Sequence, residues 1–366
     1  MSNDTLGMAA LLLVAASISV VLILVIVGIR FRRSAVERSH ARLRKSLLEA
    51  WTRRSPALIR SSMDEVASGS LRSLADLAHC ARAAQERGLW DEELVGVIRE
   101  SVHSSGLGTR LLAMLDSRRP QRRGLAVLLG GLSICTIDEH TLARFLYDPD
   151  PTVRLTAVAS LAQEQTPEAA VELITALNEN LVEEPRIIER LGEPWAVSTV
   201  IEALSDDRHE PETRNGLLSA LAISRDARAL PIATRLAKSA DDEKLVRSLR
   251  VLAACADVAN TDQLTEIATI ARTAAYSRNA AARNIAATLL TYLSSPEREE
   301  ILTLLARDPD WFVRRSAVRT LLSVGDEGIR RVHELTQDAD TFTAQRAREE
   351  WLRRTIRITS PAAADG

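Results

Sequence analysis

Aromatic side chains are scarce in this chain of 366 residues. They make up 3% of it, whereas hydrophobic residues as a whole make up 46%. Burial must therefore depend on alanine and leucine, which both favour helices. Stretches rich in β-branched and aromatic residues, from which strands are built, are missing outside the N-terminus. The composition predicts an all-α fold.

Cysteine and lysine are also rare. The three cysteines, Cys80, Cys135 and Cys255, lie far apart in apolar helical stretches. This spacing excludes a disulfide framework and a cysteine-based metal site, so we expect buried free thiols in a reducing compartment. Only three of the 47 basic residues are lysines. We interpret the excess of arginine as the mark of a GC-rich bacterial genome rather than of a function specific to guanidinium groups.

Motifs of catalysis and cofactor binding are missing from the sequence. The six histidines are scattered without metal-ligand spacing, and there is no nucleophile elbow, phosphate-binding loop or dinucleotide fingerprint. Acidic residues occur in the first turns and on the exposed faces of predicted helices, where the helix dipole favours them. The sequence therefore predicts no catalytic residue, no metal site and no cofactor.

The N-terminus contains one long uncharged stretch, residues 6–29, which covers 24 positions. As a helix it is about 36 Å long, enough to cross a hydrocarbon core of about 30 Å with some tilt. A cleaved signal peptide would need a basic start and a shorter apolar core, but the only charge before the stretch is Asp4. A buried core helix does not need so many apolar positions. We predict an uncleaved transmembrane helix over residues 6–29, preceded by a short external N-terminus.

A basic juxtamembrane segment follows the predicted transmembrane helix. Residues 30–60 contain ten basic and two acidic side chains, beginning with Arg30, Arg32 and Arg33. Positively charged flanks stay in the cytoplasm, so this segment places the rest of the chain inside and the N-terminus outside. It can also bind anionic lipid headgroups. Residues 61–366 hold 37 basic and 46 acidic side chains, which argues against nucleic acid as a partner, because phosphate binding needs a basic groove.

Arginine recurs at a nearly fixed spacing through the last two thirds of the chain, at intervals of 28 to 36 residues. Each arginine lies near the start of an apolar helical stretch, and DPDPTVRLTAV around the second of them matches DPDWFVRRSAV around the seventh. A period of about 20–50 residues is the signature of stacked repeats, in which each repeat contacts only its neighbours. The eight arginines are Arg123, Arg154, Arg186, Arg214, Arg247, Arg283, Arg314 and Arg346.

Most repeats show two helices joined by a turn. Near Arg154, the first helix ends at Asp148-Pro149, because proline cannot continue helical hydrogen bonding, and Pro151 suits the first turn of the second helix. We expect atypical capping helices at 61–105, the repeat stack at 106–355 and a flexible tail at 356–366. The predicted helix pairs begin with 138–147 and the helix after Pro151, followed by 166–180 with 184–191, 195–205 with 212–223, 228–238 with 242–256, 261–273 with 279–293, 296–307 with 310–324 and 327–336 with 343–354.

This pattern resembles HEAT repeats, a family of armadillo-like helix-turn-helix solenoids. A turn aspartate and a second-helix arginine recur in that family. In this chain Asp148, Asp241, Asp308 and Asp340 each stand six residues before one of the eight arginines. The resemblance covers roughly residues 106–354 and implies an α-solenoid of about eight helical hairpins.

The repeated arginines have two interpretations. They could present a ladder of cations to an anionic ligand. Alternatively, each guanidinium group could hydrogen-bond a turn aspartate of its own or the next repeat and so fix the stacking, a geometry for which arginine is well suited. The constant offset of the aspartates favours the structural interpretation.

Trp311 is the most interesting single residue for contact with a partner. It lies beside Phe312 and shortly before Arg315 and Arg319, and tryptophan and arginine are enriched among the residues that dominate interface energetics. The alternative is a tryptophan folded over the previous repeat, since this residue is usually largely buried. The candidate partner-binding residues are therefore Trp311, Arg315 and Arg319.

Together these features predict a membrane-anchored cytoplasmic scaffold that binds protein partners. Confinement to the membrane plane raises the effective concentration of such a surface for a membrane partner. The resemblance to bacterial membrane-anchored HEAT-repeat proteins implies a membrane glycosyltransferase or a signalling complex as partner, by analogy alone. A HEAT-like lyase-type enzyme or a regulatory subunit acting at the membrane stays open as the alternative, because such chemistry leaves no simple motif.

Overall fold

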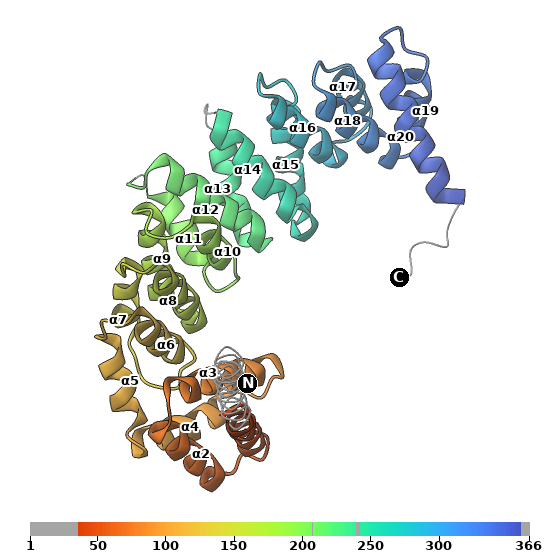
Figure 1. The fold of residues 1–366 in the computed structure, drawn as a ribbon. Helices are drawn as coiled ribbons and strands as arrows, with labels where there is room; N and C mark the ends of the chain where they lie inside the picture. Colours follow the sequence, from red (N-terminus) through yellow and green to blue (C-terminus); the bar gives the residue numbers. More distant parts are fainter. Residues whose placement is uncertain (1–35, 207, 239–241, 360–366) are drawn as a thin grey trace, which may run out of the picture. The chain divides into compact units, whose positions relative to one another are not determined.

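The computed structural model describes residues 36–206, 208–238 and 242–359 of the chain. Within these residues every regular element is an α-helix or a 3-10 helix (Figure 1), which confirms the predicted all-α fold. The chain divides into two compact units, Met1–Gln163 and Glu164–Gly366. Each unit is a stack of helical hairpins.

The first unit begins with a helix over the described residues 36–52. Its further α-helices are α2 (Pro56–Ser68), α3 (Leu71–Glu86), α4 (Glu92–Ser104), α5 (Leu107–Leu115), α6 (Pro120–Gly131), α7 (Glu139–Ala143) and α8 (Pro151–Glu164), and the 3-10 helix η1 (Arg144–Tyr147) extends α7.

The helix over residues 36–52 packs into this first unit. Leu43, Leu47, Ala50 and Trp51 are buried, and their spacing places them on one helix face. The packed array therefore begins before residue 61, where the sequence predicted the first capping helices. Much of the expected basic juxtamembrane segment is folded into it.

The second unit consists of six hairpins. Their helices are α9 (Pro167–Asn178), α10 (Glu184–Leu191), α11 (Val197–Ser205), α12 (Pro211–Ser224), α13 (Leu230–Ala237), α14 (Asp242–Cys255), α15 (Thr261–Ala274), α16 (Ala280–Leu289), α17 (Glu297–Leu305), α18 (Trp311–Ser323), α19 (Asp326–Leu335) and α20 (Thr341–Thr359). Three short 3-10 helices, η2 (Ala227–Ala229), η3 (Ala256–Val258) and η4 (Leu290–Tyr292), adjoin α13, α14 and α16.

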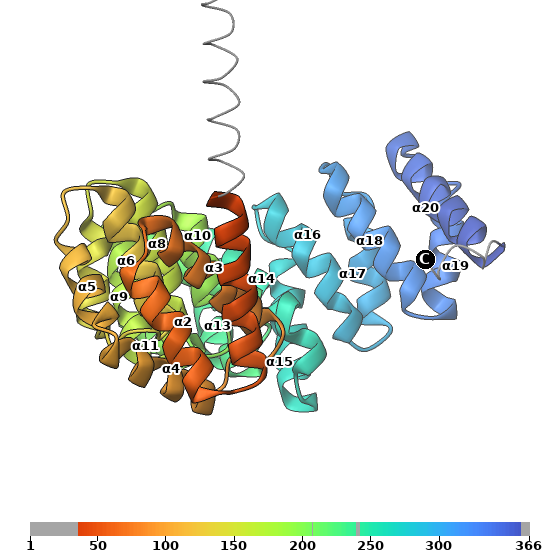
Figure 2. The ribbon, with the colours of Figure 1, turned by 60° about the horizontal axis from the view of Figure 1, so that its bottom comes forward.

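The hairpins of the second unit form two layers. The second helices, α10, α12, α14, α16, α18 and α20, contact one another in succession and make the more extensive contacts. Figure 2 shows α16, α18 and α20 side by side, with α15, α17 and α19 in the other layer. From α12 to α18, each second helix therefore packs between two others like it.

Small side chains allow the second helices to approach closely. In the first unit, a Cβ atom on Gly131 in α6 would lie 2.3 Å from the Cβ of Ser160 in α8. The Ser160 hydroxyl donates a hydrogen bond of 3.0 Å to the carbonyl of Val127. The core is thus built from close backbone contact and small residues, which explains how a chain so poor in aromatics buries a continuous interior.

The predicted transmembrane helix, residues 6–29, lies outside the described residues, as do Arg30, Arg32 and Arg33. No helix within the described parts of the chain is long and apolar enough to cross a membrane.

Candidate functional site

One arginine near the start of a second helix binds two successive turns. In α6, Arg123 donates from Nε and Nη2 to the two carboxylate oxygens of Asp148, at 2.7 Å each. Its Nη1 donates to the carbonyl of Ser117 at 2.8 Å. The side chains of Arg123 and Asp148 are only 13% and 4% exposed. The hydrogen bond from Arg123 lowers the pKa of the Asp148 carboxyl and raises the pKa of the guanidinium.

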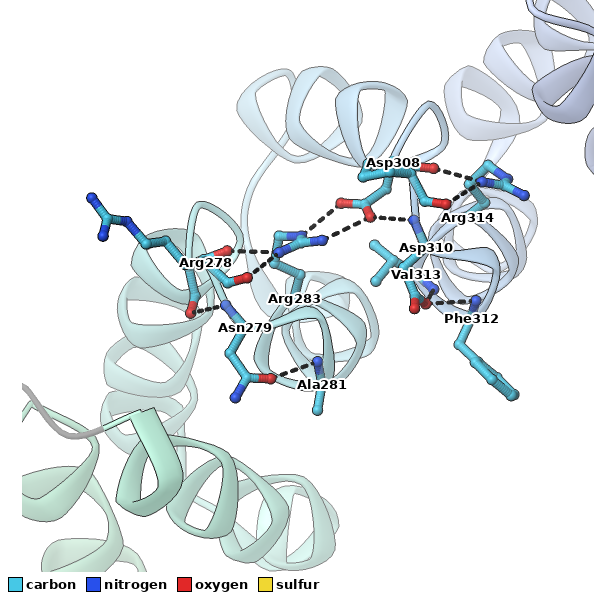
Figure 3. Close-up of polar contacts among 11 residues, drawn as sticks. Arg278, Asn279, Ala281, Arg283, Asp308, Asp310, Phe312, Val313 and Arg314 are labelled. Carbon is cyan, nitrogen blue, oxygen red and sulfur yellow. Dashed lines mark hydrogen bonds and ion pairs between the residues drawn. The ribbon is translucent and has the colours of Figure 1, made fainter.

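Figure 3 shows the same arrangement at Arg283 in α16. Its Nε and Nη2 donate to Asp308 at 2.6 and 2.9 Å, and its Nη1 donates to the Ser277 carbonyl at 2.9 Å. Asp308 also accepts from the N–H of Asp310 at 2.8 Å, and its own carbonyl accepts from Arg314 at 2.7 Å. Hydrogen bonds thus pass from one turn to the next through a single aspartate.

These contacts decide between the two pairings that the sequence left open, with an aspartate of the same repeat or of the next one. The carboxylate of Asp148 binds Arg123, which precedes it by 25 residues, whereas Arg154 donates to the backbone carbonyl of Asp148 at 2.9 Å. The side chain six residues before an arginine therefore does not need to be acidic. This is why serines can stand at that offset before Arg123 and Arg283.

Other members of the arginine series have different surroundings. Arg247 donates to the hydroxyl of Ser219 in the preceding second helix at 3.0 Å and lies 3.6 Å from Glu243. Arg186 is exposed and Arg214 is half-buried. Asp241 lies outside the described residues.

The last hairpin corrects the register assigned to Asp340 and Arg346. Asp338 accepts from the N–H of Asp340 at 2.9 Å, as Asp308 does from Asp310, so Asp338 is the turn aspartate. Asp340 instead caps α20 and accepts from the N–H of Thr343 at 3.2 Å. Six residues after Asp338 stands Ala344, so Arg346 is displaced by two positions from the series.

The displaced Arg346 belongs to a cluster around a buried carboxylate. Glu350 in α20 is 3% exposed. Its oxygens lie 2.7 Å from Arg353, 3.2 Å from Arg319, 3.5 Å from Arg315 and 3.9 Å from Arg346. Two of the predicted partner-binding residues, Arg315 and Arg319, are thus held by a carboxylate of the following hairpin.

Trp311 lies at one end of this cluster. Its ring centroid is 4.3 Å from the guanidinium carbon of Arg346 and 5.3 Å from that of Arg315. The ring of Phe312 stands edge-on at 4.8 Å. These ring contacts are with its own helix and the following hairpin rather than the previous repeat, and Trp311 is 38% exposed.

A second aromatic–arginine contact borders this end. Phe342, at the start of α20, is 66% exposed, and the guanidinium carbon of Arg314 lies 5.7 Å from its ring centroid. Three accessible aromatic rings, those of Trp311, Phe312 and Phe342, thus gather where α18 and α20 begin.

The other end of the cluster opens into a pocket of about 600 Å³. Leu322 and Ile356 add apolar walls to it, and Arg354 donates a hydrogen bond to the Leu322 carbonyl. We call this pocket, together with the cluster of side chains beside it, the α18–α20 groove. The pocket is lined by Arg319, Leu322 and Ser323 of α18 and by Glu350, Arg353, Arg354 and Ile356 of α20. Trp311, Arg315 and Arg346 adjoin it through their contacts with one another and with Glu350.

The charges of the groove are not a general feature of the stack. One repeat earlier in α16, the positions of Trp311, Arg315 and Arg319 are taken by Ala280, Asn284 and Thr288, and none of these is charged. Glu350 does not stand out in the sequence. In the register set by Asp338 it takes the place where other second helices bury Ser160 and Thr320, but an alignment on Arg346 puts Leu352 there instead.

The three cysteines are free and buried, as predicted. Burial raises the pKa of Cys80 to about 11, of Cys135 to about 12 and of Cys255 to about 11. Among the described residues there is no group of three or more histidine, cysteine or acidic side chains that could hold a metal ion.

Comparison with known proteins concerns the fold alone. No protein-family model matches the chain, and no curated protein matches it. Similar solved structures include an engineered protein, with 16% identity and a TM-score of 0.38 over 84% of this chain and 97% of that one. Kap121p bound to the SUMO protease Ulp1p shows 11% identity and a TM-score of 0.38, and the match covers 84% of this chain and 45% of Kap121p.

A designed armadillo repeat protein in complex with the peptide (KR)4 shows 15% identity and a TM-score of 0.34, over 58% of this chain and 97% of that one. The chain thus spans less than half the length of Kap121p. At such low similarity, the assignment to HEAT- or armadillo-like stacking rests on the helical hairpins themselves.

Proposed function

We propose that this chain is a scaffold that binds a protein partner through the α18–α20 groove. The observation that carries this proposal is the gathering of Trp311, Phe312 and Phe342 beside arginines at one edge of two consecutive hairpins, in a chain with only 3% aromatic residues. Tryptophan, tyrosine and arginine dominate the energetics of protein interfaces. Exposed aromatic rings are costly to leave in water, so their clustering indicates a surface that becomes covered.

The groove also has the form that a partner segment needs. Its α18 wall, from Trp311 to Leu322, is about 16 Å long at 1.5 Å per residue. A groove between two helices accepts a further helix through side chains at helical spacing. Because Trp311 is already stacked against Arg346, it loses little rotational freedom on binding, which favours affinity.

The proposal includes attachment to a membrane. It is supported by the uncharged stretch 6–29 and by the basic residues that follow it, including Arg30, Arg32 and Arg33. In this arrangement the two helical units lie in the cytoplasm, the basic residues contact anionic headgroups, and the partner is a membrane protein such as a glycosyltransferase or a signalling protein. A topology reporter fused after Gly366 tests the orientation, and an external signal from it would contradict this placement.

The groove is tested by site-specific photo-crosslinking of the full-length protein in its native membranes. A photoreactive phenylalanine analogue at Phe312 should give one discrete crosslinked product, and Trp311→Ala in the same chain should reduce its yield several-fold. Val171 in α9 is 52% exposed and is the matched control, at which we expect no discrete product. Equal products at both positions, or none at Phe312, would reject the groove as the binding site.

The described residues provide no specific observation in favour of the lyase-type enzyme that the resemblance also allows.

A further inference from the structure

We infer that the segment bound in the α18–α20 groove is acidic: a partner helix or strand whose carboxylates contact Arg319, Arg353 and Arg354. This inference rests on the proposed function and specifies the chemistry of the partner. It follows from the charge of the groove, from the accessibility of its arginines and from the order of its residue types.

The groove carries a positive charge that its own carboxylates do not neutralise. Arg315, Arg319, Arg346, Arg353 and Arg354 contribute five guanidinium groups. Among the described residues, the carboxylates paired with these groups are those of Glu350 and Glu349, and Glu349 lies 2.5 Å from Arg346. Three positive charges remain in excess. A buried carboxylate needs one or two charged partners, whereas Glu350 has four within 3.9 Å.

The outer arginines of the groove keep donors that a ligand can reach. Each guanidinium group has five N–H donors, and the two oxygens of Glu350 serve four such groups. Arg346 is only 7% exposed and its Nε is buried, so it is not one of the accessible donors. The side chains of Arg319 and Arg353 are 48% and 54% exposed. Glu350 therefore holds the arginines in place while their outer edges face a ligand.

The residue types change in order along the groove. Trp311 and Phe312 form an aromatic end, Arg319 and Arg353 lie in the middle, and Leu322 and Ile356 form an aliphatic end. A matching segment has an apolar residue at each end and acidic residues between them, over about 16 Å. Bidentate carboxylate–guanidinium geometry favours such a segment over a neutral one.

The inference is tested by fluorescence anisotropy with the full-length protein in detergent micelles. The probe is a labelled peptide of about 15 residues, with leucines at both ends and glutamates in the middle at helical spacing. The comparison peptide has the same sequence with glutamine in place of glutamate. We expect at least tenfold weaker binding of the glutamine peptide, because charge-assisted hydrogen bonds are lost. Binding of the glutamate peptide should weaken further as the salt concentration rises.

Matched variants locate the effect. The double change Arg319→Gln with Arg353→Gln should weaken binding of the glutamate peptide at least tenfold. The control is Arg330→Gln with Arg331→Gln in α19, where both arginines pair with Glu327 and Glu334 on the surface. This control removes the same charge and should leave the affinity within about twofold.

Equal binding of the glutamate and glutamine peptides would overturn the inference, and so would equal weakening by the two double variants. It would also be overturned if inorganic phosphate or anionic vesicles, but not unlabelled glutamate peptide, displaced the labelled glutamate peptide. If a variant misfolds, the test still stands on the unmodified protein, whose binding of the glutamate peptide should weaken as the salt concentration rises. A discrete crosslink at Phe312 together with equal peptide binding would reject the acidic segment but leave the scaffold function standing. Without that crosslink, the groove fails as the binding site, and the proposed function through it is rejected.

Discussion

The pair formed by Arg123 and Asp148 should contribute strongly to the stability of the first unit. We predict that Asp148→Asn lowers the free energy of unfolding by about 3 kcal/mol, because removing one partner of a buried ion pair leaves the other charge uncompensated. The side chains are 13% and 4% exposed, so solvent screens them little. This predicted loss is at the low end of the range usual for breaking buried ion pairs, since Arg123 keeps its hydrogen bond to the Ser117 carbonyl.

The effect should depend on pH in a defined direction. The folded pKa of Asp148 is lowered by Arg123, so its contribution is present above the unfolded value of about 3.9 and is lost as the pH falls through the folded value. The difference in stability between wild type and Asp148→Asn should therefore be constant from about pH 5 to 8 and shrink below about pH 4.

Hydrogen exchange measured by mass spectrometry is the appropriate assay, because stacked repeats open locally. Peptides from α6 and α8 should exchange faster in the variant. The control is Asp64→Asn on the exposed surface of α2, which should change stability by less than about 0.5 kcal/mol. The reasoning is refuted if the two variants behave alike at pH 7, or if the difference for Asp148→Asn is unchanged at pH 3.

Three further predictions concern single contacts. Arg154→Leu should cost about 1–2 kcal/mol, less than Asp148→Asn, because it removes hydrogen bonds to turn carbonyls and a smaller charge interaction with Asp148. Thermal unfolding measures this, and crosslinking at Phe312 should persist. Gly131→Ala should cost about 1–3 kcal/mol by forcing α6 away from Ser160, and a melting temperature equal to that of wild type would show that the contact relaxes freely. At pH 8, iodoacetamide should alkylate the three buried cysteines at least about a hundredfold more slowly in the native protein than in denaturant, because burial raises their pKa; fast native labelling would contradict the burial.

Periodicity predicted much of the fold, because each hairpin is specified locally. The helix predicted at 184–191 is α10 itself, and the helix predicted at 242–256 is α14 with one residue more. Contacts between hairpins were harder to predict. The sequence left open whether an arginine binds the turn aspartate of its own repeat or of the next one, and at Asp148 the structure selects Arg123 of the preceding repeat, because a carboxylate in a turn can reach the preceding helix as easily as its own.

The candidate site could be predicted only in part. Trp311, Arg315 and Arg319 stood out by residue type, but the carboxylate that organises them lies more than 30 residues away, in another hairpin. Nothing in the pattern of a single repeat states which faces of α18 and α20 will meet. The repeat pattern also assigned Arg346 to the wrong register. Its distance in sequence from Arg314 fits the repeat, but the turn aspartate of its hairpin is Asp338, two residues before the expected Asp340.

The guanidinium groups of Arg123 and Arg283, which each bind two successive turns, also affect the mechanics of the stack. A planar fork on a carboxylate resists twisting, so the joints that carry it, between α6 and α8 and between α16 and α18, should be torsionally stiff. At the joint between the last two hairpins, Arg307 donates from Nε and Nη2 to one oxygen of Asp338 at 2.9 and 2.7 Å, so the carboxylate is held through one oxygen rather than two. The joints of the second unit that lack the two-oxygen fork, including the one beside the groove, are therefore where the stack should bend most readily.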